Sequence, residues 1–103
     1  MNAPSPLAGL VLSGGHSRRM QTDKAGLIVH GETQLERAVR LLSAVCVKTY
    51  VSVRRDQTDD PLRRKYPQII DILENAGPAA GILAALTRFP DHAWLVVAVD
   101  LPL

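Results

Sequence analysis

The most informative stretch of this chain reads Leu12-Ser13-Gly14-Gly15-His16-Ser17-Arg18-Arg19-Met20, with Asp23-Lys24 shortly after it. It directly follows an apolar run over residues 7–12, which predicts a short buried strand. Glycine lets the backbone adopt positive φ and lets a ligand approach without a Cβ in the way. Successive N–H groups in such a turn form a concave site for an anion. Because two arginines and a lysine follow the glycines, the stretch predicts a polyphosphate-binding loop.

Spacing excludes two common phosphate-binding loops. A Walker-type loop places Gly-Lys before a hydroxyl residue, whereas Lys24 follows Asp23. The dinucleotide fingerprint needs a third glycine that packs a helix onto its strand, and Arg18 and Arg19 stand there instead. The remaining possibility is a longer and more cationic loop.

Apolar periodicity predicts alternating strands and helices along the rest of the chain. Thr33 and Glu36 form a capping box that opens a helix, whose apolar face is expected to include Val45. Pro78 suits the first position of a second helix, expected over residues 79–89, apolar on most faces and largely buried. Strands are expected over residues 7–12, 47–53, 68–72 and 94–99. The strand over 47–53 alternates in hydrophobicity, and the strand over 94–99 is expected to be central and covered on both sides. Between the strands and helices we expect a short extended piece over 27–29, a loop over 54–60 and one or two helical turns over 61–66.

This order of elements predicts a parallel three-layer α/β sheet with right-handed crossovers. In such sheets ligands bind outside the carboxyl ends of the strands, where the strand order reverses. Polar residues stand at all four of these ends: Ser13, Ser52, Asp71 and Asp100. They are therefore expected to share one edge of the sheet.

Three segments of the chain resemble the molybdenum cofactor guanylyltransferase family. Residues 12–24 match its opening pattern of leucine, a small residue, Gly-Gly, Arg-Met and Asp-Lys, with Ser13 where alanine is usual. Residues 77–82 match its Gly-Pro-Leu-Ala-Gly-Ile segment except at Ala79, and residues 97–102 match a strand that ends in a metal-binding aspartate. The resemblance implies a Rossmann-like three-layer α/β/α nucleotidyltransferase fold with a mainly parallel sheet.

Members of that family are nearly twice as long as these 103 residues. We therefore expect residues 7–103 to be the nucleotide-binding part, about the first half, of a domain truncated at its C-terminus. Residues 1–6 contain two prolines and small polar side chains that bury little, so they are expected to be a flexible tail. Such a chain would leave the strand over residues 94–99 at an exposed sheet edge, which invites self-association.

The resemblance implies an enzyme that transfers GMP from GTP to molybdopterin, forming the guanine dinucleotide cofactor and releasing pyrophosphate. Arg18, Lys24 and Asp100 are then the catalytic residues, and Asp100 binds Mg²⁺. The residues implied to bind the nucleotide are Leu12, Ser13, Gly14, Gly15, Lys24, Ser52, Asp71 and Asp100.

Two alternatives stay open. One is a related nucleotidyltransferase with another base or acceptor, such as a molybdopterin cytidylyltransferase or a sugar-phosphate nucleotidyltransferase. Within the resemblance, paired Gly14 and Gly15 favour guanine, because cytidylyl relatives tend to carry Ala-Ala-Gly in this loop. The other alternative is a non-catalytic nucleotide-binding fragment.

Composition bears on other possible functions and on location. A net charge of +2 with 4% aromatic residues does not favour nucleic-acid binding, and the Arg63-Arg64-Lys65 run is expected to be a solvated helix face. No apolar run reaches the roughly 20 residues of a membrane span. A single cysteine, Cys46, excludes an internal disulfide framework. It is expected to be a small buried hydrophobe on a helix face. The lack of an internal disulfide favours a cytoplasmic location. His16, His30 and His92 lack zinc-ligand spacing and are assigned no role.

Overall fold

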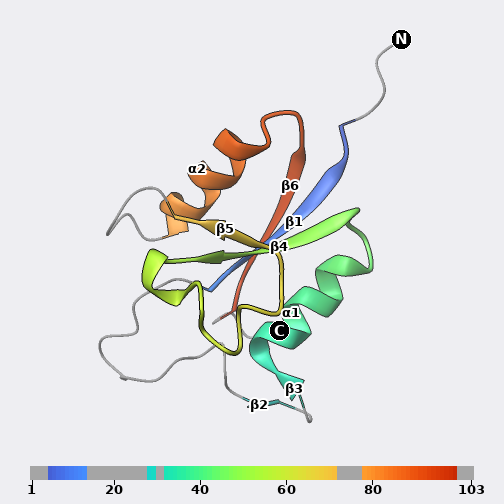
Figure 1. Cartoon of the computed structure of the whole chain (residues 1–103). Helices are drawn as coiled ribbons and strands as arrows, with labels where there is room; N and C mark the ends of the chain where they lie inside the picture. The colour runs from blue at the N-terminus through green and yellow to red at the C-terminus, as the bar shows by residue number, and fades with distance from the viewer. Residues whose placement is uncertain (1–4, 14–27, 30–31, 72–77, 100–103) are drawn as a thin grey trace.

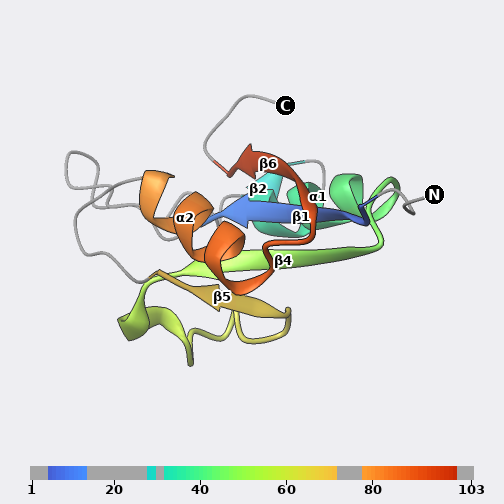
Figure 2. The same ribbon diagram turned by 90° about the horizontal axis from the view of Figure 1, so that it is seen from above.

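A four-stranded parallel sheet forms the centre of the molecule. The computed structural model describes residues 5–13, 28–29, 32–71 and 78–99. The strands are β1 (Leu7–Leu12), β4 (Lys48–Val53), β5 (Gln68–Ile70) and β6 (Ala93–Ala98), in the spatial order β5-β4-β1-β6. Each neighbouring pair runs in parallel, and Figure 2 shows the strands side by side in this order. This confirms the predicted parallel sheet.

Two helices lie on opposite sides of the sheet, so the fold has the three α/β/α layers that were predicted (Figure 1). They are α1 (Gln34–Ser43) and α2 (Pro78–Arg88). A short 3-10 helix, η2 (Arg55–Gln57), lies in the connection after β4. Two two-residue strands, β2 (Ile28–Val29) and β3 (Glu32–Thr33), pair antiparallel just before α1.

Apolar side chains fill both faces of the sheet. Because successive side chains of a strand point to opposite faces, Val11 packs with Leu35 and Leu42 of α1, whereas Leu10 packs with Ala84 and Ala85 of α2. On the α2 face the Tyr50 ring lies 5.2 Å from the Phe89 ring and 5.8 Å from the Trp94 ring, centroid to centroid. Both helices are thus held by burial against the same central strands.

The predicted capping box opens α1. The Glu36 N–H donates to Thr33 Oγ1 at 3.0 Å, and the Thr33 N–H donates to Glu36 Oε1 at 3.2 Å. The helix ends at Ser43, before Val45, which is 62% exposed, so its expected place on the apolar face is wrong. The N–H groups of Val45 and Cys46 both donate to the Leu42 carbonyl as the chain turns toward β4.

Cys46 therefore lies after the helix and not on its face. Its side chain is half-buried and packs against the cluster beneath α1. Burial raises the pKa of the Cys46 thiol, which keeps it protonated at neutral pH. Its interpretation as a small hydrophobe stands, although its expected location does not.

Two strands differ from their expected burial. β4 begins at Lys48 and is buried without alternation from its second residue on, because α1 and α2 cover its two faces. β6 is the outermost strand on its side of the described sheet, and its Leu95 is 41% exposed, so its expected cover on both sides is wrong for the residues described.

α2 begins at Pro78 as expected, but it buries only one face. Ala80, Ala84 and Ala85 are buried against the sheet, whereas Leu83 and Leu86 are 44% and 48% exposed. The expectation of a largely buried helix is therefore wrong for its outer side. Residues 61–65 form turns where one or two helical turns were expected. No helix in the described part of the chain combines the length and apolar character needed to cross a membrane.

Candidate functional site

Three residues predicted to bind the nucleotide meet at the carboxyl edge of the sheet. Ser13 directly follows β1, Ser52 lies in β4, and Asp71 directly follows β5. The Ser13 hydroxyl donates to the Ser52 carbonyl at 2.8 Å, and the Ser52 hydroxyl donates to Asp71 Oδ1 at 2.8 Å. One hydrogen-bonded chain thus joins Ser13 to Ser52, 39 positions later in the sequence, and Ser52 to Asp71, a further 19 positions later. The predicted proximity of these strand ends is confirmed.

This edge also contains the reversal of strand order. β1 has β4 on one side and β6 on the other, so the chain crosses back over β1 before it forms β6. Beyond Ala98, the Val99 N–H donates to the Leu12 carbonyl at 3.3 Å. Such a switch point is where open α/β sheets bind their ligands. The end of β6 therefore reaches the same edge as Ser13, which directly follows Leu12.

The Asp71 carboxyl carries an electrostatic cost. Burial raises the pKa of Asp71, while the hydrogen bond from Ser52 and the nearby charge of Arg54 oppose that rise. A half-buried carboxylate whose desolvation is incompletely offset gains most from a ligand that donates hydrogen bonds to it. Asp71 thus lies at the carboxyl edge of the sheet with a carboxyl group whose charged form is disfavoured by burial.

The glycine at position 81, in the motif over residues 77–82, has a packing role. A Cβ built at Gly81 would lie 2.5 Å from Ser52 Oγ and 2.8 Å from Leu12 Cδ2. Both distances are shorter than real Cβ contacts, so a side chain here would displace Ser52 or Leu12. The glycine lets α2 approach two residues that are predicted to bind the nucleotide.

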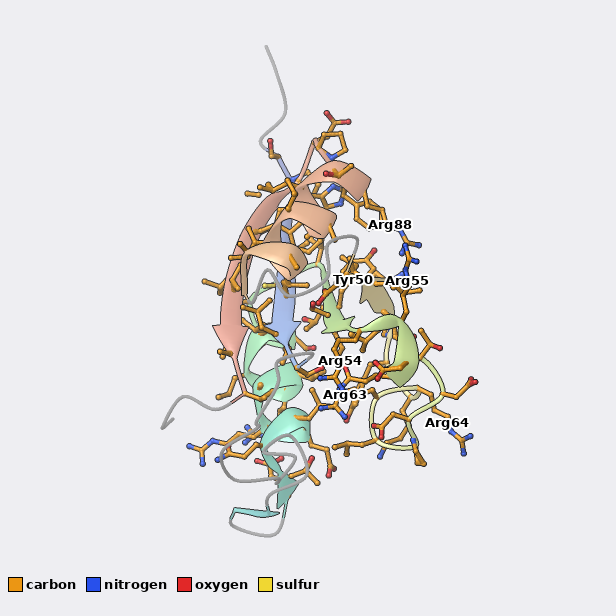
Figure 3. The ribbon with its side chains drawn as sticks, turned by 90° about the vertical axis from the view of Figure 1, so that its left-hand side faces the viewer. Tyr50, Arg54, Arg55, Arg63, Arg64 and Arg88 are labelled. Atoms are coloured by element: carbon orange, nitrogen blue, oxygen red, sulfur yellow. The ribbon has the colours of Figure 1, made fainter. Side chains whose placement is uncertain are left out.

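Arg63 is a residue of this edge that sequence reasoning missed. It is 2% exposed, so the prediction of a solvated basic face is wrong for Arg63, although Arg64 and Lys65 are exposed. Its Nε donates to Ser13 Oγ at 3.1 Å and its Nη2 donates to the Ser13 carbonyl at 2.8 Å. Figure 3 shows Arg63 near the end of β1 beside Arg54, with Arg64 directed outward.

The turn over residues 61–65 directs Arg63 inward. Asp60 accepts from the Arg63 backbone N–H and pairs with Arg63 Nη1, both at 3.1 Å. An aspartate three residues before an arginine was the available sequence signal. It could indicate the local pair, but not the contact with Ser13, which lies 50 residues away in the sequence.

Five predicted site residues lie outside the described residues, namely Gly14, Gly15, Arg18, Lys24 and Asp100. Within the described ranges, no three His, Cys, Asp or Glu side chains are grouped so that they could hold a metal ion. The described part of the site is therefore the portion built by Leu12, Ser13, Ser52, Arg63 and Asp71.

Two curated relatives align with nearly all of this chain. It is 44% identical over 101 residues to a protein of Opitutus terrae named probable molybdenum cofactor guanylyltransferase, covering 95% of this chain and 50% of that protein. It is 39% identical over 97 residues to a Synechocystis protein named molybdenum cofactor biosynthesis bifunctional protein, covering 94% of this chain and 28% of that protein. The chain thus spans half or less of these relatives.

A solved structure and a family model agree with these relatives. The crystal structure of molybdopterin-guanine dinucleotide biosynthesis protein A from Archaeoglobus fulgidus matches with a TM-score of 0.68 and 28% identity, over 90% of this chain and 47% of that one. The family model described as MobA-like NTP transferase domain matches residues 9–103. This chain therefore belongs to the MobA-like NTP transferase domain family.

Proposed function

We propose that this chain forms the GTP-binding part of a molybdenum cofactor guanylyltransferase. The observation that carries the proposal is the hydrogen-bonded chain of Ser13, Ser52 and Asp71, which unites three strand ends at the switch point of the sheet. The names of the relatives support GTP and molybdopterin as the substrates.

The proposed reaction is an in-line displacement at the α-phosphorus of GTP. A phosphate oxygen of molybdopterin attacks this phosphorus, and the bond from it to the oxygen that bridges to the β-phosphate breaks. The products are the guanine dinucleotide cofactor and pyrophosphate. Such a transfer depends mainly on positioning and on stabilising phosphate charge, so the protein needs cations and oriented N–H groups more than a nucleophile.

Asp71 and Ser13 are proposed to hold the nucleoside. The Asp71 carboxylate can accept two hydrogen bonds from the N1–H and amino edge of guanine, or bind a ribose hydroxyl. A carbonyl oxygen can accept two hydrogen bonds, so the contact of the Ser13 carbonyl with Arg63 is compatible with a second one from the base. Ser52 supports this arrangement through its hydrogen bond to Asp71, and Leu12 lies beside it at the end of β1.

The remaining roles are proposed on the sequence. Gly14 and Gly15 surround the phosphates, and Arg18 and Lys24 neutralise them. Asp100 supplies a carboxylate oxygen, the ligand type that Mg²⁺ prefers. When bound, Mg²⁺ would neutralise charge on the transferring phosphates. A cytoplasmic location is proposed because the chain's only cysteine cannot form an internal disulfide.

The test is the thermal stability of the chain with each of the four nucleoside triphosphates. A ligand that binds only the folded state stabilises it, by about 2.7 kcal/mol at a hundred times its Kd. We expect GTP with Mg²⁺ to raise the Tm more than CTP, ATP or UTP does. A larger shift with CTP would favour a cytidylyltransferase, and equal shifts would remove the assignment of guanine.

Asp100→Asn provides the control for the metal. It preserves the shape of the side chain but removes its charge, so the gain in Tm from adding Mg²⁺ to GTP should disappear. A variant that still responds to Mg²⁺ as the wild type does would contradict the assignment of Asp100.

A further inference from the structure

We infer that Arg63 is a positioning residue for the nucleotide site: it holds Ser13 at the end of β1 through both the hydroxyl and the carbonyl of that residue. The inference rests on the proposed function, because it assigns Arg63 to the same nucleotide site. It concerns a residue from the connection between β4 and β5, which the sequence motifs of the site do not include.

The burial of the Arg63 guanidinium requires that it be paired. A guanidinium that is only 2% exposed is unfavourable unless it is paired and hydrogen-bonded, because burial removes the charge from water. Asp60, on the same turn, pairs with Nη1 and also accepts the Arg63 backbone N–H. Asp60 therefore fixes the guanidinium locally, while Nε and Nη2 of Arg63 both donate to Ser13.

The geometry at Ser13 explains how Arg63 acts at a distance. Nε and Nη2 of one planar guanidinium hold the hydroxyl and the carbonyl of the same residue. The carbonyl belongs to the peptide unit that leads to Gly14, and a peptide unit is planar. Holding that oxygen therefore fixes the orientation of the Ser13 carbonyl, which is proposed to accept a hydrogen bond from the base. A lysine at this position could not reproduce this, because an ammonium group lacks the fork.

The Ser13 hydroxyl links Arg63 to the rest of the site. It accepts from Arg63 Nε and donates to the Ser52 carbonyl, while Ser52 itself donates to Asp71. Alanine at position 13 could make neither hydroxyl contact. Arg63 and Ser13 should consequently behave as a coupled pair, so that the loss of one reduces what the other contributes.

The experiment measures GTP affinity in the presence of Mg²⁺ for the full chain and five variants. Arg63→Lys keeps the charge and removes the fork, and we expect about a tenfold weaker Kd, the effect of losing one charge-assisted hydrogen bond. Ser13→Ala should weaken binding about threefold. In the Ser13→Ala background, Arg63→Lys should cost clearly less than it costs in the wild type.

Two controls separate positioning from stability. Arg64→Lys makes the same change at the exposed neighbour and should leave the Kd within about twofold of wild type. Leu42→Val loosens the core under α1, near Gly9 in β1, and should lower the Tm while leaving the Kd within about twofold. All affinities are measured below the Tm of every variant.

The outcomes distinguish the two proposals. A wild-type chain that binds no nucleoside triphosphate contradicts the proposed function, and the role of Arg63 with it. GTP binding that is normal in Arg63→Lys, or effects of Arg63→Lys and Ser13→Ala that simply add, contradict the role of Arg63 alone. If Arg63→Lys does not fold, Ser13→Ala decides, because it retains the buried pair of Asp60 and Arg63 but removes the hydroxyl contact, which the inference requires. Wild-type affinity in that variant would overturn the inference.

Discussion

At the scale of single residues, a buried cation and a half-buried anion stand at the two ends of one polar chain. Arg63 contacts Ser13, Ser13 contacts Ser52, and Ser52 contacts Asp71. Arg63 Nε, the Ser13 hydroxyl and the Ser52 carbonyl form hydrogen bonds in series, which strengthen one another in a low-dielectric setting, whereas the Ser52 hydroxyl bonds Asp71 separately. The chain therefore orders the site, but it leaves Asp71 with a carboxyl whose pKa is raised by burial.

The cost at Asp71 predicts opposite effects of one substitution on stability and on binding. Asp71→Asn removes the buried charge and can still accept from the Ser52 hydroxyl. We expect its Tm at neutral pH to rise by about 2–5 °C and its affinity for GTP to fall about tenfold. Thermal melts and calorimetric titration measure the two effects. Asp59→Asn, at an exposed carboxyl, is the matched control and should change neither.

The pH dependence of the stability gained by Asp71→Asn follows from the direction in which the pKa of Asp71 is shifted. The folded pKa of Asp71 lies above the ordinary value of 3.8, so the folded state holds this proton more tightly than the unfolded state. Stability from this group falls as pH rises through the window between 3.8 and the folded pKa. The advantage of Asp71→Asn should thus be full at neutral pH and should vanish below 3.8. An advantage that is constant with pH would point to a cause other than this carboxyl.

At the scale of elements, the site depends on how closely α2 approaches β1 and β4. Gly81 permits that approach, because a Cβ there would lie 2.5 Å from Ser52 Oγ. Helix propensity alone predicts that Gly81→Ala stabilises α2 by about 1 kcal/mol. Overpacking typically costs about 1–3 kcal/mol, and Ser52 cannot yield freely, since its hydroxyl is bonded to Asp71.

We therefore expect Gly81→Ala to lower both the Tm and the affinity for GTP. Thr87→Ala, at an exposed position of the same helix, also raises helix propensity but meets no such neighbour. It should leave the affinity unchanged and should not lower the Tm. Melting curves and GTP titrations of the two variants provide the measurement. A Gly81→Ala chain that gains stability as Thr87→Ala does would show that α2 adjusts without disturbing Ser52.

Local signals in the sequence predicted the elements, whereas long-range packing did not follow from them. Thr33 with Glu36 and the proline at position 78 mark helix starts by chemistry within one turn, and both predictions are confirmed. The proximity of the strand ends followed from parallel strand direction alone. Arg63 could not be predicted, because its burial depends on Ser13, 50 residues earlier, and a run of charges ordinarily lies in water.

At the scale of the whole molecule, the two edges of the described sheet differ. β5 has three residues, and Arg88 Nη1 donates to the Gln68 carbonyl at 3.2 Å. β6 has six residues, and within the described ranges nothing pairs with its outer side. Leu95 on β6 is 41% exposed, and Leu83 and Leu86 on α2 leave further apolar surface in contact with solvent. A long apolar edge strand offers its N–H and C=O groups to another chain.

The last prediction is that a polypeptide of these 103 residues self-associates through β6, with a second copy as the partner. Light scattering should give an average mass that rises with concentration. Leu95→Lys should lower that mass, because a lysine on an edge strand opposes pairing. Val45→Lys adds the same charge at a 62% exposed position outside the strands and should have a smaller effect. If the chain stays monomeric at every concentration, or if both lysines act equally, β6 is not the surface through which copies meet.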